Sequence, residues 1–339
     1  MSKKNYVENL VEGVGVNDTF LISSRSVQKD RNGKDYIRMT LRDRTGQIAA
    51  VRWNASESEI EKISEIDYVL IEGCVTSFQG QLQLNISRFS KSPDDIDPTD
   101  YIDRSQNDPI AMMAELMEIL STIQNPQLTK LLELIFEDKK IKKLFMEAPA
   151  AEKAHHAYIG GLLEHTLNVV KNAASIVDSY KSINRDLLLT SAALHDIGKI
   201  YEFSWERTPS YTENGRLVGH LVGGVMLIKE KAEQIEGFEG QLSDLLQHAV
   251  LSHHGCKEWG SPVEPMTIEA LVLHCADDLD AKINMFEKAI EAAGKCGKNS
   301  IFTPRHTLLN RYIYMRPILA DDEDGQYIQS TSVSSDEGF

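Results

Sequence analysis

Residues 15–92 alternate apolar and polar positions with a period of two, the pattern of half-buried β-strands. The strand-like runs TFLISSRSVQ, YIRMTLRD and QIAAVRWN are separated by the turns Asn32-Gly33 and Arg44-Thr45-Gly46. A short helical stretch, SESEIEKIS, comes next, and YVLIEGCVTSF and QLQLNISRF then flank a turn at Gln79-Gly80. The pattern therefore predicts three strands, one helix and two further strands.

This order of elements is that of an oligonucleotide-binding (OB) barrel. The segment LRDRTGQIAAVRW resembles the strand pair of OB domains that bind single-stranded nucleic acid. We therefore expect a multidomain protein whose N-terminal β-barrel, an OB fold, covers residues 1–92.

From Pro109 onward the apolar positions recur with helical periodicity, as in GLLEHTLNVVKNAASIVDSY and IEALVLHCADDLDAKINMFEKAI. Strand-like runs are nearly absent there, so residues 109–318 are predicted to form an all-α helical bundle. Residues 93–108, rich in Asp and Pro, are predicted to be a linker. The acidic, Ser-rich residues 319–339 are predicted to be a disordered tail.

Composition is that of a globular protein, with 339 residues, of which 42% are hydrophobic and 26% charged. No apolar run reaches the roughly 18–20 residues that cross a bilayer, and the N-terminus lacks the apolar core of a signal peptide. We therefore expect a cytoplasmic protein without a membrane partner. Four scattered cysteines without C-x-x-C spacing predict neither a disulfide framework nor a zinc knuckle.

The net charge of −15 argues against a protein that simply coats nucleic acid. The stretch from Arg25 to Arg52 differs, because it holds eight basic and three acidic residues. Such a face fits phosphate-backbone binding as well as an ordinary solvated strand face. Candidate nucleic-acid contacts on or beside the strands are Tyr36, Arg38, Arg52, Trp53 and Phe78. A single aromatic residue on a strand is more commonly part of the core.

An ordered set of imidazoles and carboxylates lies in the helical part. In chain order it comprises His165, His195-Asp196, His220, His253-His254 and Asp277, each on a predicted helix or at its end. Asp196 follows an apolar helix, where a buried carboxylate needs a partner. These ligand types suit divalent cations such as Mn²⁺, Fe²⁺, Zn²⁺ or Co²⁺. Two oxygens on Asp196 and the number of imidazole nitrogens suffice for a two-metal centre.

Each of these residues taken alone has a simpler interpretation. A lone histidine on an apolar helix, such as His165, is more often a core or surface histidine. His253-His254 fits a helix C-terminus, which favours cationic side chains, and Asp277 fits a solvated helix face. The order and the helical placement of the whole set favour a metal site over these readings.

With LHDIGK around His195-Asp196, the set resembles the HD superfamily of metal-dependent phosphohydrolases. More narrowly, HHAYIGGLLEHT (155–166), GRLVGHL (215–221), LSHHG (251–255) and ADDLDAK (276–282) resemble the YhaM-type 3′–5′ exoribonucleases, which join an OB domain to an HD domain. By position, the basic HD ligands correspond to His165, His195, Asp196 and Asp277. The positions that add a second metal correspond to His220, His253 and His254. Asp277 is chosen over Asp278 because it follows Ala276 in the A-D pattern of HD domains.

The resemblance implies a metal-dependent exoribonuclease that digests single-stranded RNA from its 3′ end. Two divalent ions are expected, Mn²⁺ before Co²⁺, Fe²⁺, Mg²⁺ or Zn²⁺. The expected catalytic residues are Asp196, Lys199 and Arg216. Lys199 lies three residues after Asp196 and Arg216 lies shortly before His220, so either could hold a substrate phosphate, and either also fits an ordinary helix-terminal or loop charge. Single-stranded DNA stays open as a substrate. The apolar helices of residues 110–146 fit either a homo-oligomer or completion of the HD core.

Two other functions also fit the residues. One is an HD phosphohydrolase acting on a small nucleotide, and the other is a non-catalytic protein that binds single-stranded nucleic acid. The OB domain counts against the first, because a small nucleotide needs no groove for a strand. The complete ligand set counts against the second.

Overall fold

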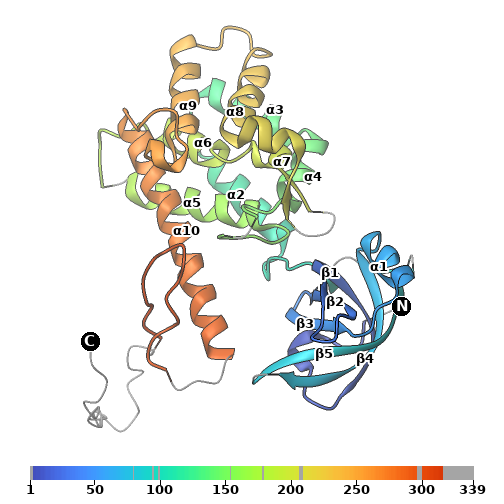
Figure 1. The fold of residues 1–339 in the computed structure, drawn as a ribbon. Coiled ribbons are helices and arrows are strands. Elements are labelled where there is room, and N and C mark those ends of the chain that lie inside the picture. The colour runs from blue at the N-terminus through green and yellow to red at the C-terminus, as the bar shows by residue number, and fades with distance from the viewer. Residues whose placement is uncertain are drawn as a thin grey trace, which may run out of the picture. The chain divides into compact units, whose positions relative to one another are not determined.

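A β-barrel is followed along the chain by a set of helices (Figure 1). The computed structural model describes residues 3–78, 80–93, 95–97, 100–152, 154–177, 179–205, 209–295 and 300–315. The predicted fold class, an OB-type barrel and then a helical domain, is confirmed. The tail predicted over residues 319–339 lies outside the described residues.

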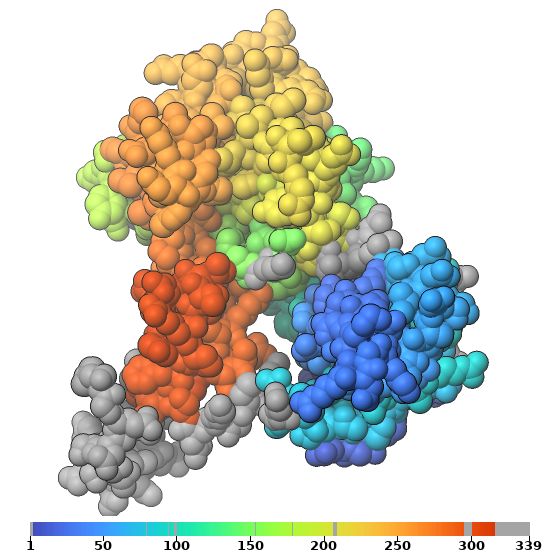
Figure 2. Space-filling view, in the orientation of Figure 1, coloured from blue at the N-terminus to red at the C-terminus, as the bar shows by residue number. Residues whose placement is uncertain are grey.

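Five strands close the barrel in the order β1-β2-β3-β5-β4. Their bounds are β1 (Gly15–Lys29), β2 (Asp35–Asp43), β3 (Gly46–Arg52), β4 (Tyr68–Phe78) and β5 (Gln81–Lys91), with α1 (Glu57–Ser64) between β3 and β4. Antiparallel pairing of β1 with β4 and parallel pairing of β3 with β5 close the sheet. On β2, Ile37, Met39 and Leu41 point into the core, which leaves the residues between them for the outer face. Figure 2 shows the barrel side chains, blue to cyan, as one packed body.

Three described residues of the predicted linker make specific contacts. Tyr101 and Ile102 are buried against Leu21 of β1. Further along, the backbone N–H of Ser105 donates to the carbonyl oxygen of Ile159 at 2.9 Å. Two apolar residues are too few to produce a periodic signal, so the sequence pattern could not reveal this packing.

The helices that follow the barrel are α2 (Pro109–Leu120), α3 (Pro126–Phe136), α4 (Lys139–Glu147), α5 (Gly161–Val177), α6 (Arg185–Leu194), α7 (Lys199–Glu202), α8 (Glu213–Ala232), α9 (Gly240–Ser252) and α10 (Ile268–Lys295). Helices α2, α3 and α4 each begin after an Asp or Asn whose side chain accepts from a free backbone N–H of the first turn. A short strand pair, β6 (Phe203–Ser204) and β7 (Ser210–Tyr211), lies between α7 and α8. None of the described helices combines the length and apolar character that a membrane crossing requires.

The helical core surrounds α5 and α6. Every residue of α6 from Leu187 to Leu194 is buried, and so is most of the first three turns of α5. A helix that is apolar on all sides can only be stable when it is covered on all sides. The polar residues that directly follow α6, His195 and Asp196, are therefore held inside the domain.

Candidate metal centre

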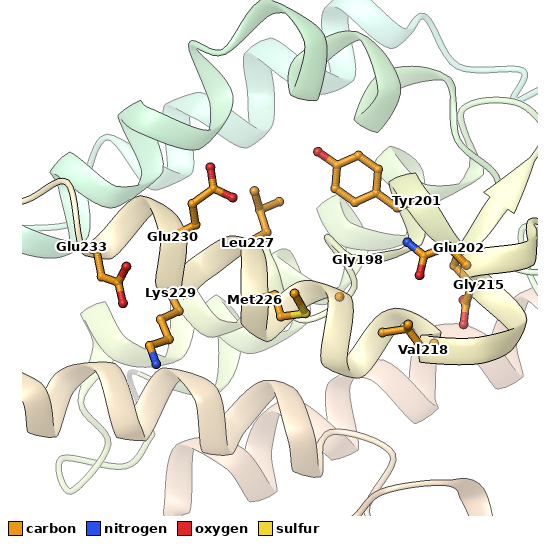
Figure 3. A pocket seen from close by; sticks show the side chains of 13 residues that line it. Gly198, Tyr201, Glu202, Gly215, Val218, Met226, Leu227, Lys229, Glu230 and Glu233 are labelled. Carbon is orange, nitrogen blue, oxygen red and sulfur yellow. The ribbon is translucent and has the colours of Figure 1, made fainter.

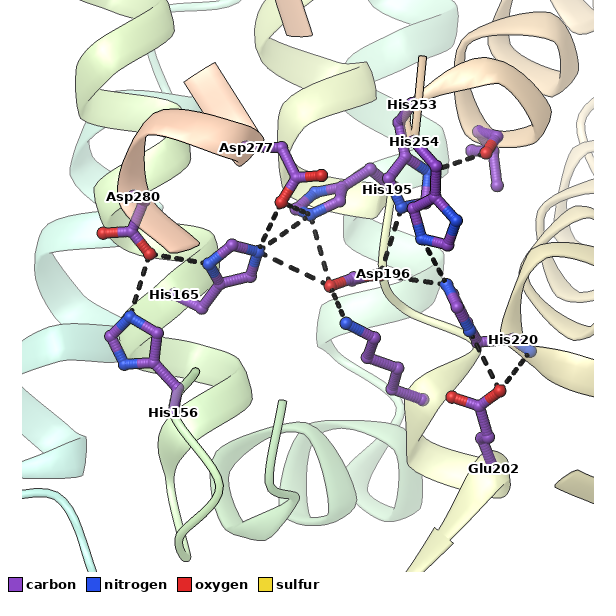
Figure 4. A network of polar contacts seen from close by, with 12 residues as sticks. His156, His165, His195, Asp196, Glu202, His220, His253, His254, Asp277 and Asp280 are labelled. Carbon is purple, nitrogen blue, oxygen red and sulfur yellow. Dashed lines mark hydrogen bonds and ion pairs between the residues drawn. The ribbon is translucent and has the colours of Figure 1, made fainter. Parts of the chain in front are cut away.

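Seven side chains converge inside the helical domain, from α5, α8 and α10 and from the residues that directly follow α6 and α9 (Figure 4). Their ligand-type atoms form overlapping groups, each within 4.8 Å, made of His165-His195-Asp277, His195-Asp196-His253 and His220-His253-His254. His165, His195, Asp196 and His253 are almost completely buried. The structure thus brings together all the side chains that the sequence pattern selected as metal ligands.

Each of the five imidazoles is oriented by a hydrogen bond at its Nδ1 atom. Three donate to backbone carbonyl oxygens at 2.7–2.9 Å, namely His195 to Ala192, His253 to Val250 and His254 to Trp259. Two donate to carboxylates, His165 to Asp280 at 2.7 Å and His220 to Glu202 at 3.0 Å. Because every partner is an acceptor, Nδ1 carries the proton, and Nε2 is left as the atom that can bind a cation.

Two pairs of Nε2 atoms lie close together. The Nε2 atoms of His165 and His195 are 3.3 Å apart, and those of His220 and His254 are 3.2 Å apart. With the Nδ1 protons engaged elsewhere, a proton or a metal cation is needed between these facing lone pairs. Asp196 Oδ1 is also buried and makes no hydrogen bond within the described part of the chain. The donor set therefore fits divalent metal ions.

The carboxylate of Asp196 faces two groups of imidazoles. Its Oδ2 atom lies 3.5 Å from Nε2 of His165 and 3.3 Å from Nε2 of His195. Its Oδ1 atom lies 3.5 Å from Nε2 of His220 and 3.4 Å from Nε2 of His253. A carboxylate that presents each oxygen to a different ligand group has the arrangement of a bridging ligand.

Lys199 balances the charge of Asp196, with Nζ 2.5 Å from Oδ2. Burial alone would raise the pKa of Asp196, but the charges of Lys199 and His195 outweigh burial and hold the pKa well below its usual value. Burial lowers the pKa of His253, and it lowers the pKa of His254 to about 3. Near neutral pH these three groups are therefore in the protonation states that bind metals.

His165 differs from the other buried histidines. Burial alone would lower its pKa, but hydrogen bonds to Asp277 and Asp280 outweigh burial and raise the pKa to about 9. Asp277 Oδ1 lies 3.1 Å from His165 Nε2, the atom that would bind a metal. The structure thus brings Asp277 into the cluster, and the choice of Asp277 over Asp278 as a metal ligand stays a prediction.

Three supporting residues were not among the predicted site residues: His156, Glu202 and Asp280. Asp280 Oδ2 accepts from His165 and also lies 2.9 Å from Nε2 of His156. Asp280 follows Asp277 by three residues, so helical spacing could have placed both on one face. Glu202 has no such signal, because its contact with His220 depends on how α7 packs against α8.

Two glycines allow that packing. A Cβ atom on Gly198 would lie 2.1 Å from the carbonyl oxygen of His220, so no larger residue fits there without movement of α8. Gly219, with φ of 74°, breaks the helical path of α8 just before His220. The freed backbone N–H of His220 donates to Glu202 Oε1 at 3.0 Å, alongside the bond from the ring. A cavity of about 530 Å³, lined by Gly198, Glu202 and one face of α8, borders this carboxylate (Figure 3).

Arg216, a predicted phosphate contact, lies exposed on the first part of α8. Its guanidinium carbon is 5.1 Å from the ring centroid of Tyr211. Lys199, the other predicted phosphate contact, is instead buried and paired with Asp196. Contact of either side chain with a substrate stays a prediction.

On the barrel, Tyr36, Arg38 and Trp53, three of the predicted nucleic-acid contacts, lie near one another, and Arg52 lies apart from them. The rings of Tyr36 and Trp53 lie 4.7 Å apart, with Trp53 44% exposed, and Arg38 is exposed on the same face of β2 as Tyr36. Phe78, 63% exposed, ends β4. Arg52, the last residue of β3, lies opposite the buried Ile37 of β2 and pairs with Glu59 of α1 at 3.0 Å. The structure therefore does not place Arg52 on the aromatic face.

Comparison with known proteins follows the same division of the chain. The family described as HD domain matches residues 162–282, and the family described as OB-fold nucleic acid binding domain matches residues 21–91. A family described as putative helicase matches residues 106–186. The chain is 35% identical over 310 residues to the 3′–5′ exoribonuclease YhaM of Geobacillus sp. (strain WCH70), covering 91% of this chain and 94% of the relative. The chain belongs to the YhaM family of 3′–5′ exoribonucleases.

The family assignment does not depend on one relative. YhaM of Bacillus subtilis (strain 168) is 32% identical over 307 residues, which cover 90% of this chain and 96% of that protein. The matches span both the barrel and the helices, so the YhaM family membership predicted from the HD motifs is confirmed. Among solved structures, the HD domain of the L. monocytogenes phosphodiesterase PgpH covers 45% of this chain and 80% of its own, at 19% identity and a TM-score of 0.30, which is too weak a likeness to bear on function.

Proposed function

We infer that this chain is a metal-dependent 3′–5′ exoribonuclease that hydrolyses phosphodiester bonds of single-stranded RNA. One observation carries the inference: the two carboxylate oxygens of Asp196 face separate groups of imidazoles. These residues lie within the part of the chain that matches the HD domain family. The direction of digestion and the choice of RNA rest on membership of the YhaM family.

We propose that the centre holds two divalent ions. The first would bind His165, His195, Asp196 and Asp277, and the second would bind Asp196, His220, His253 and His254. Mn²⁺ is the proposed identity, since mixed imidazole and carboxylate ligands suit it, and Co²⁺, Fe²⁺, Mg²⁺ and Zn²⁺ are the ions to compare with it. When bound, such a pair activates water and stabilises charge on phosphate oxygens.

The residues of the chain prepare this centre for a polyanion. Asp280 and Glu202 hold two ligand rings in place by accepting from Nδ1. With a cation bound at Asp196, the ammonium group of Lys199 would be available to a phosphate oxygen as a point charge. Arg216 is proposed as an outer phosphate contact, because it is exposed at the start of the helix that carries His220.

The barrel is proposed to hold the strand. Tyr36, Trp53 and Phe78 offer rings on which bases stack, at about 1–3 kcal/mol for each base, and Arg38 offers a charge to the backbone. We also propose that the protein acts in the cytoplasm. Assembly into a homo-oligomer stays a prediction.

The test compares Asp196→Asn with Asp244→Asn, which changes an exposed carboxylate on α9. Purified proteins with Mn²⁺ are given end-labelled single-stranded RNA, single-stranded DNA or a cyclic dinucleotide, and circular dichroism checks that each variant is folded. We expect the wild type and Asp244→Asn to shorten RNA stepwise from the 3′ end, and Asp196→Asn to be inactive.

Three other outcomes would contradict this proposal. Hydrolysis of the cyclic dinucleotide alone would assign the small-nucleotide alternative. Binding of RNA without cleavage by the wild type would assign the non-catalytic alternative. Wild-type RNA cleavage by Asp196→Asn would exclude the metal centre described above.

A further inference from the structure

The helix α4 carries an unusual concentration of positive charge for a chain with a net charge of −15. Lys139, Lys140, Lys142 and Lys143 all lie in its first half. Cations at a helix N-terminus oppose the helix dipole, and like charges three or four residues apart repel, each by a few tenths of a kcal/mol. The four lysines therefore weaken the helix rather than stabilise it.

Three of these lysines line one groove. Lys139, Lys142 and Lys143 share a face of α4, opposite the buried Ile141 and Phe145. With Arg104 and the polar residues that precede α2, they line a groove of about 680 Å³. Lys140 does not line it.

The charge partners of these cations set the groove apart from other basic sites of the chain. Within the described residues, no ion pair involves Arg104, Lys139, Lys142 or Lys143, whereas Lys130, Lys171, Lys199 and Lys231 are all paired with acids. The groove also contains Asp108 and Glu147, so its lining has a net charge of +2. Exposed, unpaired cations around a concave surface are complementary to a polyanion.

The groove is fixed to the helix that carries the first metal ligand. The backbone N–H of Gly160, which lines the groove, donates to the carbonyl oxygen of Glu147 at 3.1 Å, and Gly160 directly precedes α5. Four residues separate Gly161 from His165, a distance of about 6 Å along the axis of α5. The groove therefore lies about one helical turn from the first metal ligand.

Hydrogen bonds continue from the groove to the metal centre. Asn107, at the groove, donates to Glu164 Oε1 at 3.1 Å, and Tyr158 donates to Glu164 Oε2 at 3.0 Å. Tyr158 Oη lies 2.7 Å from Nδ1 of His156, which bonds to Asp280, the partner of His165. The groove and the centre therefore belong to one connected structure.

We propose that this basic groove binds the RNA strand on the 5′ side of the bond that is cleaved, a proposal that rests on the exoribonuclease function above. When the 3′ end lies at the metal centre, the rest of the strand must leave it over the neighbouring surface. Lysine ammonium groups bind phosphates as point charges, and the side chains of Ser105, Gln106 and Asn107 are of the type that contacts phosphate and sugar. The lining sets four exposed cations against two carboxylates, and this excess of positive charge favours a polyanionic strand as the occupant.

The experiment compares Lys142→Gln with Lys140→Gln, which removes the same charge from the same helix outside the groove. A triple variant, Lys139→Gln with Lys142→Gln and Lys143→Gln, gives the full effect, and thermal melting checks folding. Substrates are a single-stranded RNA of about 20 nucleotides, longer than one OB fold occupies, and a dinucleotide.

For the triple variant, we expect the loss of kcat/KM on the long RNA to exceed the loss on the dinucleotide by about tenfold. The slope of log affinity for RNA against log salt should become shallower by about 2, since each phosphate contact of a single strand contributes about 0.7. Lys140→Gln should retain wild-type KM and slope.

Equal losses of kcat/KM on the long RNA in Lys140→Gln and Lys142→Gln would overturn the proposal. Such a result would show that the net charge of the protein matters and that the position of the lysine in the groove does not. An active triple variant with wild-type KM and slope would also overturn it while leaving the exoribonuclease function intact. Selective loss of affinity for a poly-glutamate peptide, with RNA affinity unchanged, would assign the groove to an acidic protein partner. Absence of RNA cleavage by the wild type would instead contradict the proposed function.

Discussion

At the scale of single residues, burial and hydrogen bonding decide what each ionisable group can do. Asp196 is buried with an unsatisfied oxygen, and Nδ1 of every imidazole in the centre is committed to an acceptor. Asp277 belongs to this arrangement through its 3.1 Å contact with His165. A comparison of substitutions at Asp277 and at Asp278 therefore tests this arrangement directly.

Replacement of Asp277 by Asn should reduce metal affinity and activity by more than the 10–100-fold that loss of a supporting residue commonly costs. The reason is that the substitution removes the negative charge that would bind a cation beside His165. Asp278→Asn, one residue further along α10, serves as the matched control and should retain metal binding within a few-fold. Metal titration of both metal-stripped variants checks this, and the reverse order of effects would show that the wrong aspartate was assigned.

At the scale of elements, the site depends on where helices end and how closely two of them pack. His195-Asp196 follows α6 and His253-His254 follows α9, so the ligands extend from helix ends into the core. Contact between α7 and α8 then brings His220 to the same place, and Gly198 is the point of closest approach.

Gly198→Ala should destabilise the protein by about 1–3 kcal/mol, as overpacking does, and should displace His220 from the metal centre. Gly223→Ala is the matched control, because a Cβ atom there would be 4.0 Å from its nearest neighbour, the carbonyl oxygen of Gly198. That variant should be within about 1 kcal/mol of wild type, since alanine favours helix. Urea unfolding and metal titration measure both effects, and equal stability of the two variants would exclude close packing at Gly198.

At the scale of the whole molecule, metal binding is coupled to protonation and folding. Without metal, His165 holds a proton up to a pH of about 9, because its hydrogen bonds to Asp277 and Asp280 outweigh burial. A metal ion that binds Nε2 must displace that proton. Metal affinity should therefore rise with pH up to the pKa of His165. Above that pH the ring no longer holds the proton that competes with the metal ion.

We expect metal binding near neutral pH to release about one proton from His165. Calorimetric titration of EDTA-stripped protein with Mn²⁺, in buffers of different ionisation enthalpy, measures the number released. Bound metal should also raise the melting temperature, because the ion binds only the folded centre. Proton uptake on binding, or an affinity that falls as pH rises towards 9, would contradict the assigned state of His165.

The sequence by itself determined the class of each domain and the ligand types of the metal centre. Period-two alternation produces strands, and helical periodicity produces buried helices, because each places apolar side chains on one side of its element. The order of His165, His195-Asp196, His220, His253-His254 and Asp277 then indicated a metal site.

Only the tertiary structure decided how these groups act together. The pairing of Glu202 with His220 and of Lys199 with Asp196, the two faces of the Asp196 carboxylate and the groove beside α4 all depend on contacts between elements distant in sequence or on side-chain direction. A local pattern specifies which side of a helix is buried. It does not specify which atom of a neighbouring helix that side meets, because packing of the whole core sets the distance and angle between helices.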